Sequence, residues 1–104
     1  MSEPNGGNDL AEAAAKAFDG PFNAVIEFLP DDASPIWVDG RKAPKVLDKE
    51  PENTPATCIW RGSKDALLRV LAGERALENA FVSGRITIAG DMSVMARLKL
   101  KGSR

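Results

Sequence analysis

Residues 63–98 read SKDALLRVLAGERALENAFVSGRITIAGDMSVMARL, and this stretch decides the fold. Its first part predicts a helix over 63–73, because Ser63 offers a capping hydroxyl and Leu67, Leu68 and Leu71 recur on one helical face. The glycine at position 73 favours a helix end there. The stretch therefore begins with a short helix whose leucines face a core.

A second helix is predicted directly after the first. Leu77, Ala80 and Phe81 recur at i, i+3 and i+4, which is typical of a helix with one buried face. Gly84 provides the end of this helix, so its predicted span is 76–84.

A strand and a last helix complete the stretch. Ile86 and Ile88 alternate with polar neighbours, which predicts a half-buried strand over 85–89. Asp91 then caps a helix predicted over 91–98. The predicted order of elements in this stretch is therefore helix, helix, strand, helix.

The segment AFVSGRITIAGDMSVMARL, preceded by DALLRVLAGE, resembles the sterol carrier protein type 2 domain over about residues 56–98. The pattern consists of a helix ending in glycine, an Ala-Phe helix, a glycine-flanked basic and apolar strand, and a methionine-containing final helix. The residues that carry it are Gly73, Ala80, Phe81, Gly84, Arg85, Ile86, Ile88, Gly90 and Met92.

The resemblance implies an α+β domain with a mostly antiparallel sheet of about five strands, covered on one face by helices, and an apolar tunnel between the two layers. In the family such a tunnel takes sterols, fatty acids, acyl-CoA or phospholipids. Periodicity alone favours an ordinary core for the apolar side chains, whereas the resemblance assigns a subset to the tunnel wall. The predicted lipid-binding residues are Trp60, Leu67, Leu71, Phe81, Ile86, Ile88, Met92, Met95 and Leu98.

The residues before this stretch predict one helix and four strands. The helix begins at Asn8 as its cap and ends at the Gly-Pro pair 20–21, with residues 1–7 as a flexible N-terminus and 8–104 as a single domain. Cys58 and Trp60 are expected to point inward, and Ile59 outward toward another layer or a partner subunit. The strands are predicted over 22–29, 36–38, 44–47 and 56–61.

Length and composition are those of one globular domain, and its expected location is the cytoplasm. The chain has 104 residues, of which 43% are hydrophobic and 28% charged. No apolar run approaches the roughly 20 residues that cross a bilayer, and the N-terminus lacks the basic and apolar parts of a secretory signal. The C-terminus is not Ser-Lys-Leu, so no peroxisomal address is expected.

Residues for catalysis or metal binding are missing from the sequence. It has no histidine, the commonest general base and neutral metal ligand, and a single cysteine, Cys58, which strand period places in the core. The adjacent pair Asp31 and Asp32 lies in a proline-flanked turn and is expected to be a solvated hairpin tip. We therefore predict no enzyme activity, no cofactor and no metal site.

Charge is unevenly distributed although the net charge is −1. Counting Asp, Glu, Lys and Arg gives −6 for residues 1–56 (eleven acids, five bases) and +5 for residues 57–104 (four acids, nine bases). The basic half suits transient contact with an anionic membrane surface or with coenzyme A phosphates, or is simply a solvated rim. No aromatic and basic interleaving is present, so nucleic acid is not an expected partner.

The resemblance, together with the missing catalytic residues, implies non-catalytic intracellular binding and transfer of a hydrophobic small molecule, a fatty acyl, isoprenoid-type or sterol-like lipid, including fatty acid or acyl-CoA. The alternative is a non-catalytic interaction or oligomerisation module that assists a separate lipid-metabolising enzyme. The protein is expected to be a monomer or a homodimer. Lys99 is a candidate head-group contact, because a continued last helix would place it between Met92 and Met95.

Overall fold

The structure is a computed structural model that describes residues 6–102. Four helices and five strands are present in this part of the chain. In chain order they are α1 (Gly6–Ala17), β1 (Val25–Pro30), β2 (Ile36–Asp39), β3 (Lys45–Leu47), β4 (Cys58–Gly62), α2 (Lys64–Val70), α3 (Glu74–Val82), β5 (Ile86–Gly90) and α4 (Ser93–Arg97).

The five strands form one sheet in the order β3-β2-β1-β4-β5. The three pairs β1–β2, β2–β3 and β4–β5 are antiparallel, whereas β1 and β4 are parallel. The predicted α+β class and five-stranded sheet are therefore confirmed, but the sheet is mixed rather than mostly antiparallel. The parallel pair arises because the chain leaves β3 through a long loop and returns on the far side of β1.

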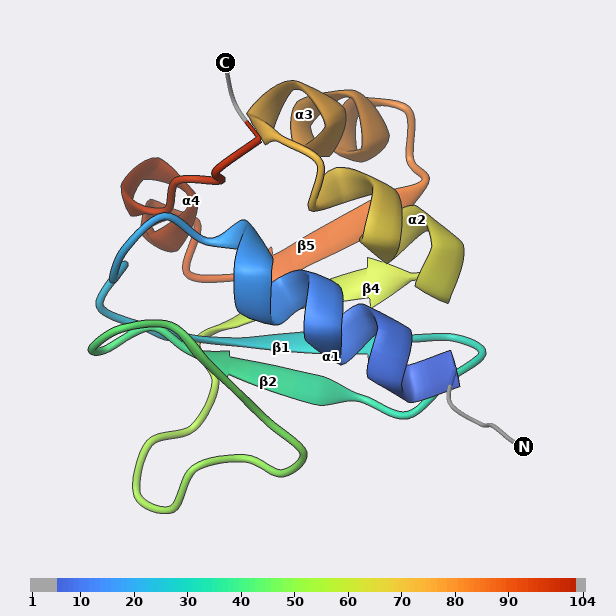
Figure 1. The fold of residues 1–104 in the computed structure, drawn as a ribbon. Helices are drawn as coiled ribbons and strands as arrows, with labels where there is room; N and C mark the ends of the chain where they lie inside the picture. Colours follow the sequence, from blue (N-terminus) through green and yellow to red (C-terminus); the bar gives the residue numbers. More distant parts are fainter. Residues whose placement is uncertain (1–5, 103–104) are drawn as a thin grey trace.

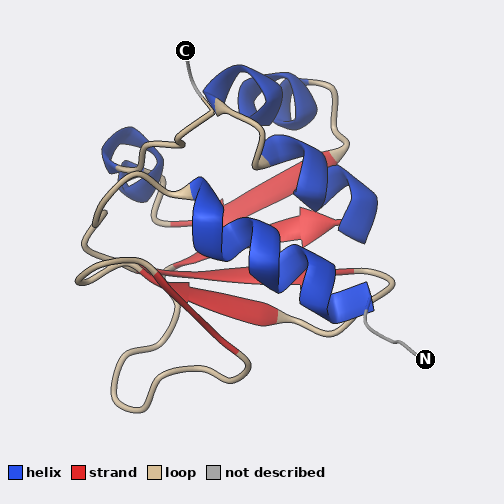
Figure 2. Ribbon diagram, in the orientation of Figure 1, coloured by secondary structure: helices blue, strands red, loops and turns tan. Residues whose placement is uncertain are grey.

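The helices form a layer against one face of the sheet. In Figure 1, α1 and α2 cross in front of the strands, while α3 and α4 lie toward β5, and Figure 2 separates the two layers by colour. Because β5 is an edge strand, the helices beside it border the rim of the sheet rather than its centre.

An aromatic cluster occupies the centre of the core. Phe28 of β1 stacks on Trp60 of β4 with ring centroids 4.8 Å apart, and both side chains are 0% exposed. Phe18 lies 5.2 Å from the ring of Phe22 and 6.5 Å from that of Trp60. Cys58 is also fully buried, so the inward orientation predicted for β4 is confirmed.

The opposite face of the sheet has no helix over it in the described residues. Glu27 pairs in register with Trp37 on one side and with Ile59 on the other, and all three are half-buried. The outward position predicted for Ile59 is confirmed. Burial, together with the nearby Glu50 carboxylate, raises the pKa of Glu27.

The caps of the helices agree only in part with the sequence. The Ser63 hydroxyl accepts a hydrogen bond from the Ala66 N–H at 3.0 Å, as predicted, and an Asp32 carboxylate oxygen accepts the Lys64 N–H at 2.8 Å. By contrast α1 begins at Gly6, so Asn8 lies within it and does not cap it. The predicted flexible segment falls mainly on residues 1–5, which lie outside the described part.

The last helix is shorter than predicted and ends at Arg97, because Leu98 has an extended backbone (ψ 152°). Residues i and i+2 point about 200° apart around a helix, whereas residues i and i+2 of an extended chain point to the same side. The extended course therefore buries Leu98 and Leu100 together, at 4% and 3% exposure. The Asp19 N–H donates a hydrogen bond to the Lys99 carbonyl oxygen, with 2.8 Å between nitrogen and oxygen. This bond holds the segment beside the end of α1.

Candidate functional site

An apolar groove of about 370 Å³ lies between α3, β5 and α4. It opens to solvent on the side where the sheet ends at β5. Its lining consists of Glu74, Leu77, Glu78, Phe81, Ile88, Met92, Met95 and Leu98.

One wall of the groove is a single side of α3. Glu74, Leu77, Glu78 and Phe81 stand at i, i+3, i+4 and i+7, so they lie above one another on that side. Leu77 is 6% exposed and anchors the wall to the core, whereas Phe81 is 43% exposed. The sequence predicted Phe81 on the buried face of the helix, and the structure places much of its ring at the open groove.

The other wall is built from Met92, Met95 and Leu98, which recur every three residues around the short α4. The Asp91 carboxylate accepts hydrogen bonds from the Ser93 N–H at 3.0 Å and the Ser93 hydroxyl at 2.6 Å, and these bonds lower the pKa of Asp91. They hold the start of the wall in place.

A second anchor sits at the end of α4. The Arg97 Nε–H donates to the Phe22 carbonyl oxygen at 3.0 Å, and its Nη1 donates to the Ser93 hydroxyl at 3.1 Å. A helix of five residues has little cohesion of its own, so these side-chain bonds and the buried Val94 keep it on the domain.

The nine predicted lipid-binding residues divide into two groups. The structure brings Phe81, Ile88, Met92, Met95 and Leu98 together in the groove. It places the other four in the packed interior, at exposures of 6% or less: Trp60, Leu67, Leu71 and Ile86. Contact of any of the nine with lipid, and an enclosed tunnel, stay predictions.

Three residues of the groove were not predicted for the site, namely Glu74, Leu77 and Glu78. The sequence pattern places Leu77 on the buried face of its helix, and only apolar side chains are expected in the wall of a tunnel. The sequence nonetheless contains a signal for the two glutamates. They stand seven and three residues before Phe81 and therefore share its side of the helix.

Lys99 is exposed and does not line the groove. Its predicted position rested on a helical angle, and that premise is wrong because the helix ends at Arg97. A head-group contact at Lys99 stays a prediction that the groove geometry does not favour.

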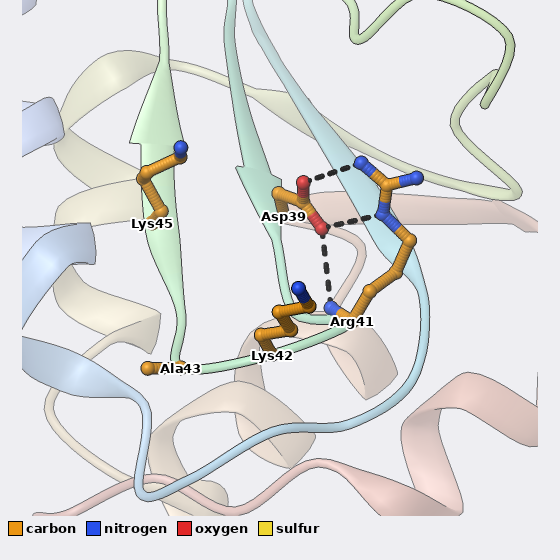
Figure 3. A pocket seen from close by; sticks show the side chains of 5 residues that line it. All are labelled: Asp39, Arg41, Lys42, Ala43 and Lys45. Carbon is orange, nitrogen blue, oxygen red and sulfur yellow. Dashed lines mark hydrogen bonds and ion pairs between the residues drawn. The ribbon is translucent and has the colours of Figure 1, made fainter.

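A second depression, of about 470 Å³, lies at the turn between β2 and β3 and is lined by Asp39, Arg41, Lys42, Ala43 and Lys45 (Figure 3). Arg41 donates from Nε and Nη2 to the two Asp39 carboxylate oxygens, at 2.9 and 2.7 Å. Its Nη1 donates to the Thr54 hydroxyl at 2.6 Å. The hydrogen bonds from Arg41 lower the pKa of Asp39 to about 2. Because Arg41 also donates to Thr54, this cluster links the turn between β2 and β3 to the loop that follows β3.

Other chemistry is limited in residues 6–102. Burial raises the pKa of the Cys58 thiol, which disfavours the reactive thiolate. Within this range no cluster of three or more acidic or cysteine side chains is arranged to hold a metal ion. The same range contains no helix long and apolar enough to cross a membrane.

Comparisons with known proteins identify solved structures and a protein family that share this architecture. Among solved structures, the chain is similar to "UbiJ-SCP2 Ubiquinone synthesis protein", with 15% identity, a TM-score of 0.59, and coverage of 86% of this chain and 73% of that one. It is similar to apo Sterol Carrier Protein 2 from Yarrowia lipolytica, with 14% identity, a TM-score of 0.53, and coverage of 88% and 75%. A search among curated proteins found no significant match. These structural likenesses show the fold, and a family model matches residues 6–100, so the chain belongs to the SCP-2 sterol transfer family.

Proposed function

We propose that this protein binds a lipid in the groove between α3, β5 and α4 and releases it again without a chemical step. The observation that carries the proposal is the exposure of large apolar side chains at this groove. Phe81 is 43% and Met92 46% exposed, although the interior beside them is closely packed. A ligand that covers both would remove apolar surface from water, at about 25 cal/mol per Å².

The shape and lining of the groove suit a flexible hydrocarbon chain. Its volume of about 370 Å³ lies at the lower end of ligand sites, which span roughly 300–1,000 Å³. Met92 and Met95 can repack around chains of different shape because their thioethers are unbranched and flexible. Fatty acyl and isoprenoid-type chains therefore fit better than a rigid, fully enclosed ligand.

Membership of the SCP-2 sterol transfer family supports lipid transfer as the activity. The similar structure described as a ubiquinone synthesis protein adds support for an isoprenoid-tailed lipid. In a cell, such a lipid would be delivered to an enzyme or a membrane, with this protein as a non-catalytic carrier.

Binding is tested first on delipidated full-length protein. Thermal unfolding is followed with dodecanol or dodecanoate, at concentrations reaching a hundred times the dissociation constant. We expect a stabilisation of about 2.7 kcal/mol from whichever probe binds. Mass spectrometry of organic extracts from the purified protein should recover a lipid. No lipid, no thermal shift and a co-purifying enzyme would contradict the proposal and favour the interaction-module alternative.

Two variants locate the site. Phe81→Ser and Met92→Ser remove apolar surface from the groove, and each should weaken probe binding about tenfold. Val82→Ser is the matched control, because Val82 is 78% exposed and adjacent to Phe81 but does not line the groove. If the control weakens binding as much as Phe81→Ser, the lipid does not bind in this groove.

A further inference from the structure

The polar side chains that line the groove are both carboxylates. Glu74 and Glu78 stand one helical turn apart on α3, and the other six lining residues are apolar. Among residues 6–102, no lysine or arginine belongs to this lining. The described part of the groove therefore combines an apolar floor with a rim of two carboxylates.

The two glutamates differ in what they already do. A Glu74 carboxylate oxygen accepts the Leu100 N–H at 3.4 Å and so helps to hold the C-terminal segment. Glu78 is exposed, and within residues 6–102 its carboxylate takes part in no hydrogen bond or ion pair. Its acceptor atoms are thus available to a bound molecule.

We propose that Glu78 makes the groove selective for an uncharged lipid that carries a hydroxyl group, over lipids with a carboxylate or phosphate head. This inference rests on the proposed function and deepens it by naming the class of lipid. A carboxylate accepts hydrogen bonds and donates none, so it can accept the O–H of an alcohol or phenol. The same carboxylate repels an anionic head group.

The position of Glu78 fits this role. It precedes Phe81 by three residues, so its carboxylate stands beside the ring that a hydrocarbon chain would cover. A lipid whose tail lies on Phe81, Met92 and Ile88 brings its head to the α3 rim when it enters from that side.

Two basic side chains that follow the groove wall in the sequence, Arg97 and Lys99, do not line the groove. Arg97 is engaged by the Phe22 carbonyl and the Ser93 hydroxyl. Lys99 is exposed on the extended segment after α4 and is not part of the lining. A unit-charge repulsion across about 4 Å of water changes affinity about fivefold, and a charge-assisted hydrogen bond adds a similar factor for the alcohol.

The test compares dodecanol with dodecanoate, two probes with the same chain and different heads, by competitive titration of the full chain at neutral pH. The two factors together predict that dodecanol binds roughly twenty-five-fold more tightly. Glu78→Gln should reduce this preference to about twofold, and Glu78→Lys should reverse it. Added salt should also narrow the preference, because the charges lie near the surface.

Two controls keep the test specific. Glu12→Gln removes an exposed helical carboxylate on α1, away from the groove, and should leave the preference unchanged. Lys99→Met should likewise have no effect. A selective loss of dodecanoate binding in Lys99→Met would overturn the inference and support the lysine as the head-group contact.

The remaining outcomes separate this inference from the proposed function. Equal binding of both probes, or an unchanged preference in Glu78→Gln, overturns the selectivity and leaves lipid binding intact. Binding of neither probe overturns the proposed function, and the inference with it. Circular dichroism of each variant confirms folding, which we expect because Glu78 is exposed.

Discussion

The helical layer has a packed side, over β1 and β4, and a groove side, beside β5, and large apolar side chains are buried to different extents on the two sides. Over β1 and β4, Phe28 and Trp60 stack in full burial, while beside β5 the side chains of Phe81 and Met92 are each nearly half exposed. The difference follows from position in the sheet. Strands β1 and β4 have neighbours on both sides and helices above them, whereas β5 is an edge strand that packs against α3 alone among the helices with substantial contacts to it.

This contrast suggests a division of labour in a small domain. A chain of 104 residues cannot leave a large cavity at its centre without a substantial loss of stability. An open groove at the rim avoids that loss, because its apolar walls are already partly in water. We expect substitutions in the packed side to act on folding, and substitutions in the groove to act on binding.

The largest expected effect is at the centre of the packed side. Trp60→Ala should destabilise the protein by about 3–5 kcal/mol, out of a total stability of about 5–15 kcal/mol. Urea unfolding followed by circular dichroism measures the loss. Trp60→Phe keeps an aromatic ring and should cost less than half as much. A loss below about 1 kcal/mol for the alanine variant would show that this side is not a solid core.

The next effect tests the junction between the two sides. Gly90 has a φ of +99°, and an added Cβ would collide with the carbonyl oxygen of Thr57, the residue just before β4. Gly90→Ala should therefore cost about 2–3 kcal/mol, which thermal unfolding can measure. Gly84→Ala is the control, since its φ is +80° but nothing lies within 4 Å of the new Cβ, so only about 1 kcal/mol is expected. Equal losses would mean that the close approach to β4 is unimportant.

A smaller effect is expected at the far edge of the sheet, where Arg41 holds the Asp39 carboxylate. The pKa of Asp39 in the folded protein is about 2, below the ordinary value of 3.8. The ionised carboxylate of Asp39 therefore stabilises the folded protein. This contribution is present above about pH 4 and is lost as the pH falls toward 2. Solvent screening at the half-exposed arginine limits it to about 1 kcal/mol.

Asp39→Asn measures this contribution. Its stability should fall below that of the parent protein at pH 6, and the two should converge near pH 2. Urea midpoints across this range give the comparison. A difference that does not change between pH 6 and pH 2 would show that the pair is not coupled to folding.

The smallest effect on stability is expected within the groove itself. Met95→Trp adds a large ring to a half-buried position that lines open space, so the free energy of unfolding should change by less than about 1 kcal/mol. The ring should occupy the space of the lipid and abolish the thermal shift with dodecanol. A loss of several kcal/mol would instead indicate overpacking and a groove that is closed in solution.

Much of the fold could be predicted from local patterns. Alternation in β4 identified Cys58 and Trp60 as inward, and Ser63 was recognised as a cap because its hydroxyl acts on the next turn. The parallel pairing of β1 with β4 could not be predicted from periodicity, because it depends on which side of the sheet the chain enters after a long loop.

The site was predicted less completely for a related reason. Periodicity identifies a buried face, but it does not distinguish Leu77, which is covered, from Phe81 on the same helix, which is not. That difference depends on the tertiary packing around the open groove. The end of α4 could not be predicted from helical periodicity either, because Leu98 and Leu100 bury together in an extended backbone.

The bridge between Phe18 and Leu100 joins positions 82 residues apart in the chain and ties the end of α1 to the segment that follows α4. During synthesis, residues 98–101 leave the ribosome after α1, the five strands and the other helices, because the chain is made from its N-terminus. The groove wall has no fixed position until these residues emerge and Lys99 and Lys101 bond to the backbone near Phe18. Capture of a lipid in the groove is therefore expected only after synthesis has passed this segment.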